Sequence, residues 1–169
     1  MGLETYGFQV KFTNLPKRDC IIEEFSKLGF YKSGENLGDI YLEKGYEYGY
    51  VEIALQNSEL HRKALNEYVL QKNREDLVET QLAKDKESMF VRIAKPNHEN
   101  IIDCFITDLR AFSENIPISV FNLQSKEIVD LHDYGNLKEH FKNTRDEFKK
   151  YYPKPTYPIR CNDVFKSSD

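Results

Sequence analysis

The 169-residue sequence contains no tryptophan and is poor in cysteine, proline and glycine, with 3, 6 and 8 of each. Cys20, Cys104 and Cys161 are far apart and form no CxxC pair, so we expect neither a disulfide framework nor a thiolate zinc site. Neither GxGxxG nor GxxxxGK[ST] occurs, which argues against nucleotide binding through a glycine-rich phosphate loop. The GxSxG elbow of many hydrolases is also missing. Sparse, unpaired cysteines favour a reducing, cytoplasmic location.

Long apolar runs and an excess of positive charge are missing as well. No stretch approaches the roughly 18 apolar residues of a membrane-spanning helix, and the residues after Met1 lack the basic and apolar regions of a signal peptide. Asp and Glu number 28 against 24 Lys and Arg, which gives a net charge of -4. Because nucleic-acid affinity depends largely on clustered Lys and Arg, we expect no nucleic-acid partner and no membrane partner. A basic protein is the favoured partner.

Large apolar residues are supplied by 11 tyrosines and 11 phenylalanines. A chain of this length can bury about two thirds of its unfolded surface, so it can fold without disulfides or metals. We expect residues 1–152 to form a single α+β domain. Pro153, Pro155 and Pro158 then interrupt regular structure, so residues 153–169 are expected to form an extended C-terminal tail.

The spacing of apolar residues predicts the order strand, helix, strand, strand, helix in each half of the chain. In the first half the expected elements are a strand over 7–12, a helix over 17–28, strands over 37–43 and 48–55 that turn at Lys44-Gly45, and a helix after Ser58. In the second half they are a strand over 89–94, a helix after Pro96, strands over 118–121 and 127–131, and a final helix capped by Gly135 or Asn136. This order is typical of an α+β domain whose antiparallel sheet is covered by helices on one face.

The two halves also carry a faint repeat, since Pro16 and Pro96, which stand 80 positions apart, open similar segments. Ile21, Ile22, Glu23 and Phe25 follow the first proline, and Ile101, Ile102, Asp103 and Phe105 follow the second. Fixed-period similarity predicts two βαββα units, over about 5–72 and 88–152, in a pseudo-twofold repeat. The element order is similar to that of duplicated strand-helix-strand-strand proteins, such as the gyrase-inhibitor-like ligand-binding domains. Chance agreement between two amphipathic helices is the alternative.

A tyrosine-rich hairpin is the candidate binding site. Alternate side chains of a strand share a face, so Tyr46, Tyr48 and Tyr50 are expected to point outward while Val51 and Ile53 point into the core. Tyrosine provides contact area at low entropic cost and keeps a hydroxyl for hydrogen bonding. The predicted partner-binding residues are Asp39, Tyr41, Glu43, Tyr46, Tyr48, Tyr50 and Glu52. The alternative is that the C-terminal tail or the second half of the domain covers these rings.

These patterns predict a non-catalytic intracellular binding protein that neutralises or regulates a basic partner, most concretely the immunity protein of a bacterial toxin. No catalytic residue, metal ligand or cofactor is assigned. A second interpretation is a regulatory domain that binds a small molecule in a cleft between its two halves. A third is a hydrolase or transferase that uses His132, Asp130, Asp133 and Cys161. Cys161 is the thiol expected to be exposed, whereas Cys20 and Cys104 are expected in the core.

Overall fold

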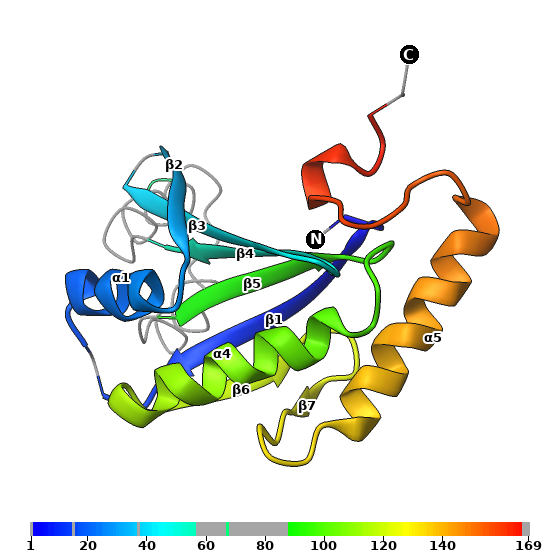
Figure 1. Ribbon diagram of the computed structural model, residues 1–169. Coiled ribbons are helices and arrows are strands. Elements are labelled where there is room, and N and C mark those ends of the chain that lie inside the picture. Colours follow the sequence, from blue (N-terminus) through cyan, green and yellow to red (C-terminus); the bar gives the residue numbers. More distant parts are fainter. Residues whose placement is uncertain (1, 15, 37, 57–66, 68–87, 167–169) are drawn as a thin grey trace.

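A computed structural model describes residues 2–14, 16–36, 38–56, 67 and 88–166. These residues form an antiparallel sheet of seven strands with three α-helices, which confirms the predicted α+β class (Figure 1). In chain order the elements are β1 (Thr5–Phe12), α1 (Arg18–Lys27), β2 (Tyr31–Asn36), β3 (Asp39–Tyr46), β4 (Gly49–Leu55), β5 (Ser88–Ala94), α4 (Ile101–Asn115), β6 (Ile118–Asn122), β7 (Glu127–Ile128), α5 (Gly135–Tyr151) and a 3-10 turn, η1 (Cys161–Asp163).

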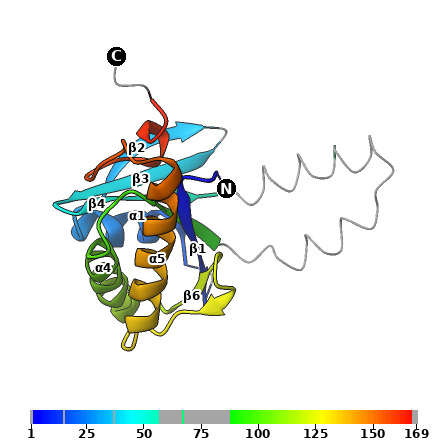
Figure 2. The same ribbon diagram turned by 90° about the vertical axis from the view of Figure 1, so that its right-hand side faces the viewer.

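The strands are arranged in the order β2-β3-β4-β5-β1-β6-β7, and each neighbouring pair is antiparallel. Helices α1, α4 and α5 lie on one face of this sheet (Figures 1 and 2). Aromatic rings join the layers, since the Phe8 ring of β1 lies 5.1 Å from Phe105 of α4. The Phe25 ring of α1 stacks on Phe112 of α4 at 4.3 Å. The core therefore lies between the helices and the central strands. The opposite face of the sheet is called the outer face below.

From the sequence, one strand was missed and one turn was misplaced. Strand β2 was not expected, because its residues Tyr31–Asn36 are mostly exposed and lack the apolar alternation that marks a strand. The β3–β4 turn lies at Glu47 and Tyr48, whereas Lys44-Gly45, the predicted turn, lies within β3. The helix predicted after Ser58 falls outside the described residues. Within the described ranges, no helix is long and apolar enough to cross a membrane.

The internal duplication is not confirmed by the topology. Strands β1 and β5, which open the two halves, pair antiparallel, as a twofold arrangement would require. However, β2, the first strand after α1, lies at the edge of the sheet, whereas β6, the first strand after α4, lies beside β1. Similar apolar spacing in α1 and α4 therefore accompanies two different strand arrangements.

The segment after α5 returns to the sheet and packs on its outer face (Figure 1). Asn97 is fully buried and forms two hydrogen bonds with Ile159: its Nδ2 donates to the Ile159 carbonyl oxygen at 2.9 Å, and its Oδ1 accepts from the Ile159 N–H at 2.9 Å. Cys161 and Val164 are buried beside Ala94 of β5. The prediction that Cys161 is exposed was therefore wrong, because this part of the expected tail contributes to a small apolar cluster.

Candidate binding groove on the outer face

The register of the β3–β4 hairpin separates the tyrosines that were expected to share a face. Tyr46 pairs with Gly49, and the two-residue turn between them interrupts the alternation that would have placed Tyr46, Tyr48 and Tyr50 in one row. The prediction of a single outward row was therefore wrong. Its physical reason is that side chains alternate along a continuous strand, whereas a turn resets which face each residue occupies.

Tyr46 faces the helices. Its hydroxyl forms a hydrogen bond with Asp108 of α4, and Lys44 donates to the same carboxylate at 2.7 Å. The Lys44 ammonium also lies 4.8 Å from the centre of the Tyr46 ring. Burial, together with the nearby Asp108 carboxylate, raises the pKa of Tyr46 far above its ordinary value. Tyr46 thus helps to join the sheet to α4 and does not line the outer face.

Tyr48 and Asp39 lie at opposite ends of the hairpin. Tyr48 is part of the turn, where its ring lies 5.5 Å from the His98 ring and its carbonyl oxygen accepts a hydrogen bond from the His98 N–H. Asp39 opens β3 and pairs with Asn36 of β2. The structure therefore does not bring these two predicted residues together.

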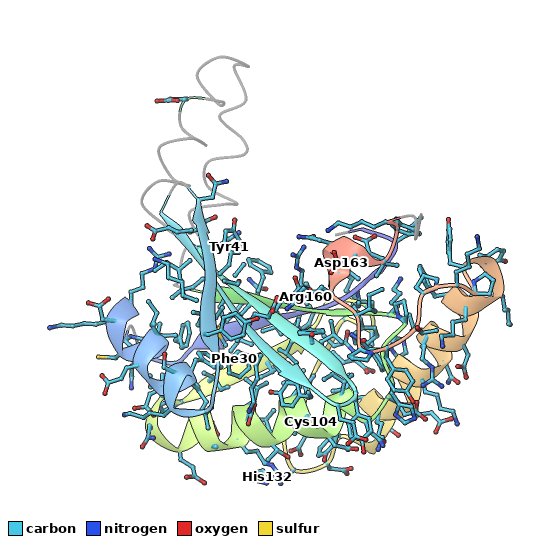
Figure 3. All side chains as sticks on the ribbon, turned by 45° about the horizontal axis from the view of Figure 1, so that its top comes forward. Phe30, Tyr41, Cys104, His132, Arg160 and Asp163 are labelled. Atoms are coloured by element: carbon cyan, nitrogen blue, oxygen red, sulfur yellow. The ribbon has the colours of Figure 1, made fainter. Side chains whose placement is uncertain are left out.

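The other four predicted residues, Tyr41, Glu43, Tyr50 and Glu52, gather on the outer face, where Glu43 pairs directly with Glu52. Beside them the sheet and the C-terminal segment enclose an open groove of about 810 Å³. Figure 3 shows Tyr41 and Arg160 on this side of the molecule, away from Cys104 of α4. The groove is lined by residues of β2, β3, β4, β5 and the C-terminal segment, among them Tyr31, Tyr41, Glu43, Glu52, Arg92, Arg160 and Asn162.

Glu43 is held by an arginine from the C-terminal segment. The Nε of Arg160 donates to both Glu43 carboxylate oxygens, at 3.0 and 2.9 Å, and its Nη2 lies 2.8 Å from Oε1. The Tyr31 hydroxyl donates to the same carboxylate. Although burial acts in the opposite direction, these hydrogen bonds hold the pKa of Glu43 below its ordinary value. The Arg160 guanidinium also lies 4.1 Å from the centre of the Tyr50 ring, a cation–π contact.

Glu52 forms the second carboxylate–guanidinium pair in the groove. Arg92 of β5 donates from Nη2 to Glu52 Oε1 at 2.9 Å and to Asn162 Oδ1 at 3.2 Å. The backbone N–H of Cys161 donates to Glu52 Oε2 at 2.9 Å. Both glutamates of the predicted binding surface are therefore neutralised by arginines of the same chain, and both tie the C-terminal segment to the sheet.

Arg92, Arg160 and Tyr31 were not identified from the sequence. Arg92 did leave a signal, because it stands between Val91 and Ile93 in β5, where alternation places a polar residue on the face opposite the core. Arg160 left none, since nothing in a proline-containing tail indicates which strand it will contact. The β2 strand that carries Tyr31 was itself not predicted.

The residues considered for catalysis do not form one site. Asp130 Oδ1 accepts hydrogen bonds from the backbone N–H groups of His132 and Asp133, at 2.8 and 3.3 Å, and so shapes the connection between β7 and α5. Cys161 lies at the other end of the molecule, in η1 (Figures 1 and 3). Burial raises the pKa of its thiol, which disfavours the reactive thiolate. Cys20 is exposed, contrary to the expectation that it lies in the core.

A second cavity, of about 640 Å³, lies between β6, β7 and the start of α5. Beside it the buried Tyr6 hydroxyl accepts a hydrogen bond from Asn122 Nδ2 at 2.8 Å and lies 2.6 Å from His140 Nδ1. Burial raises the pKa of Tyr6 to about 12.

Among the described residues, no group of three or more His, Cys, Asp or Glu side chains is arranged to hold a metal ion. The chain matches no protein-family model, and no curated protein or solved structure shows significant similarity to it.

Proposed function

We propose that this protein is a non-catalytic intracellular module that binds, and so neutralises or regulates, another protein, most concretely as the immunity protein of a bacterial toxin. The observation that carries the proposal is the gathering of Tyr41, Glu43, Tyr50 and Glu52 beside one groove of about 810 Å³. Phenol rings next to hydrogen-bonding charged groups resemble the composition of protein recognition surfaces. A groove of this kind can receive a loop or a side chain of a partner.

The preference for a basic partner rests on the charge of the whole chain. A net charge of -4 attracts a cationic protein at long range and speeds its association at low salt. The groove itself contributes little to this attraction, because Glu43 and Glu52 are each paired with an arginine. We therefore assign the steering to the overall surface and the specific contacts to the groove.

The proposal is tested by mixing the protein with the products of the genes next to its own, measuring binding by calorimetry and assaying any toxic activity. We expect one product to bind and to lose activity on binding. Tyr41→Ala should weaken binding about tenfold or more, as expected for a tyrosine at the centre of an interface. Tyr151→Ala is the matched control, because Tyr151 is an exposed tyrosine at the end of α5.

Two results would count against this function. The first is that no product of an adjacent gene binds or is inhibited. The second is that a partner binds Tyr41→Ala as tightly as the unmodified protein, which would place the interface elsewhere.

A small-molecule ligand is the second candidate, and the size and position of the groove favour it. The groove lies between strands β2 to β4 of the first half and the segment that follows the second half, and its volume falls within the range of known ligand pockets. A ligand that binds only the folded state raises the apparent melting temperature. A thermal-shift screen of metabolites should then find compounds whose effect is lost when Arg92 is replaced by Gln.

A further inference from the structure

The two ion pairs of the groove are arranged with their carboxylates inside and their guanidinium groups outside. The side chains of Glu43 and Glu52 are 7% and 12% exposed, whereas those of Arg160 and Arg92 are 40% and 43% exposed. Each pair is neutral in sum, yet the groups that a ligand meets first are the cationic ones. The groove therefore presents positive charge on a chain whose overall charge is negative.

Both guanidinium groups are held in place before any ligand arrives. Arg160 is fixed in plane by Glu43 and stacks over the Tyr50 ring at 4.1 Å. Arg92 is fixed by Glu52 and Asn162. A guanidinium carries five N–H donors. Glu43 engages Nε and Nη2 of Arg160, the Tyr31 hydroxyl is a further hydrogen-bond partner of the same guanidinium, and Glu52 and Asn162 engage Nη2 of Arg92. The other N–H groups belong to side chains that are two-fifths exposed, so binding through them costs little additional ordering.

We propose that this groove binds a single carboxylate group, which Arg92 and Arg160 hold through hydrogen bonds. A planar carboxylate matches the fork of N–H donors on a guanidinium, and charge-assisted bonds of this kind are among the strongest in proteins. A cationic group is disfavoured, because the Glu43 and Glu52 oxygens already accept hydrogen bonds from the chain itself. A polyanion is disfavoured as well, since the two glutamates and the net charge of -4 repel extended negative charge.

This inference goes beyond the proposed function, because it concerns one chemical group and not the overall charge of a partner. A protein that is basic as a whole can still offer one aspartate or glutamate to the groove. A free small acid has the same chemistry. The experiment must therefore separate these two sources of the carboxylate.

The test titrates the full chain with acetate and, separately, with a capped peptide that carries a single glutamate, using sodium chloride at matched ionic strength as the blank. Binding is followed by calorimetry and by the NMR signals of the arginine side chains. We expect saturable binding of at least one probe. Arg92→Gln and Arg160→Lys should each weaken it about tenfold, the loss expected when a bidentate pair becomes a single contact.

Arg145→Lys is the matched control, because Arg145 of α5 forms a comparable, largely buried ion pair with Glu99 away from the groove. Its affinity for both probes should be unchanged. The double variant Glu43→Gln/Arg160→Gln removes both charges of one pair at once. It replaces Arg160→Lys if that variant does not fold, and it should also bind the probes about tenfold more weakly.

Saturable binding of acetate assigns the site to a small acid, and binding of the peptide alone assigns it to an acidic side chain of a protein. Either result supports the proposal. Failure of both probes to bind overturns it. Unchanged affinity in Arg92→Gln and in the Arg160 variants overturns it too, since the carboxylate would then be bound elsewhere. Because no partner protein takes part, these results are independent of the test of the proposed function.

Discussion

Replacing Asn97 by alanine should release the C-terminal segment from the sheet. The Asn97 side chain is fully buried and exchanges two hydrogen bonds of 2.9 Å with the Ile159 backbone. A hydrogen bond contributes about 0.5–1.5 kcal/mol net, so the loss of two should lower the free energy of unfolding by about 1–3 kcal/mol. For a chain of this size that corresponds to a fall in melting temperature of roughly 2–12 °C.

The prediction is checked by urea unfolding and by hydrogen exchange at the backbone N–H groups of Ile159 and Cys161, both of which donate to side chains of the sheet and its adjoining loop. Exchange should become faster at both positions in Asn97→Ala. Asn115→Ala is the matched control, because Asn115 is exposed and donates a single hydrogen bond to Glu24; its effect should stay within about 0.5 kcal/mol. Unchanged exchange at Ile159 together with unchanged stability would refute the claim that Asn97 anchors this segment.

Three further predictions concern the fold. Gly49→Ala should destabilise the protein by about 1–3 kcal/mol in thermal unfolding, because Gly49 has φ of 149° and an added Cβ would lie 2.3 Å from the Asn97 side chain. Part of this loss should vanish in a double variant in which Asn97 is also replaced by alanine. Raising the pH from 10 to 12 should lower the free energy of unfolding by about 2 kcal/mol. The reason is that the pKa of Tyr6 is about 12 in the folded state and 10.0 ordinarily, so the stabilisation present below pH 10 disappears as Tyr6 ionises. The Tyr6→Phe variant should not show this loss. Iodoacetamide should label Cys20 in the native state and Cys161 only after unfolding, as peptide mass spectrometry would show; equal labelling of both would contradict the burial of Cys161.

Strong apolar patterns in the sequence identified most of the described elements. The alternation of Phe8, Val10 and Phe12 marks β1, and the helical spacing of Ile21 and Phe25 marks α1. Helices α4 and α5 carry comparable buried stripes and were both predicted. The start of α5 was placed correctly at Gly135, whereas α4 begins at Ile101 and not directly after Pro96. Strand β2 lacks such a pattern. It lies at the edge of the sheet, is mostly exposed and pairs with β3 through backbone hydrogen bonds, which do not require alternating apolar side chains.

The candidate site was predicted only in part. Tyr41, Glu43, Tyr50 and Glu52 do share the outer face, because they lie within continuous strands where period-two alternation holds. Tyr46 lies on the helix side because the true turn lies three residues later than expected. One misplaced turn is enough to move a side chain from one face of a sheet to the other.

Local patterning of apolar and polar residues was sufficient to establish the α+β class, the order of the principal elements and the inward face of each helix, since those features follow from how neighbouring residues repeat along the chain. Contacts between distant segments could be seen only in three dimensions. Glu43 and Arg160 stand 117 positions apart, and their pairing depends on where the C-terminal segment crosses the sheet. No periodic pattern in the sequence predicts where this segment crosses the sheet. Its position is set by the hydrogen bonds of buried Asn97 and by the apolar contacts of Cys161 and Val164, which form only when the chain has packed. The charge that the groove presents is thus a property of the assembled fold.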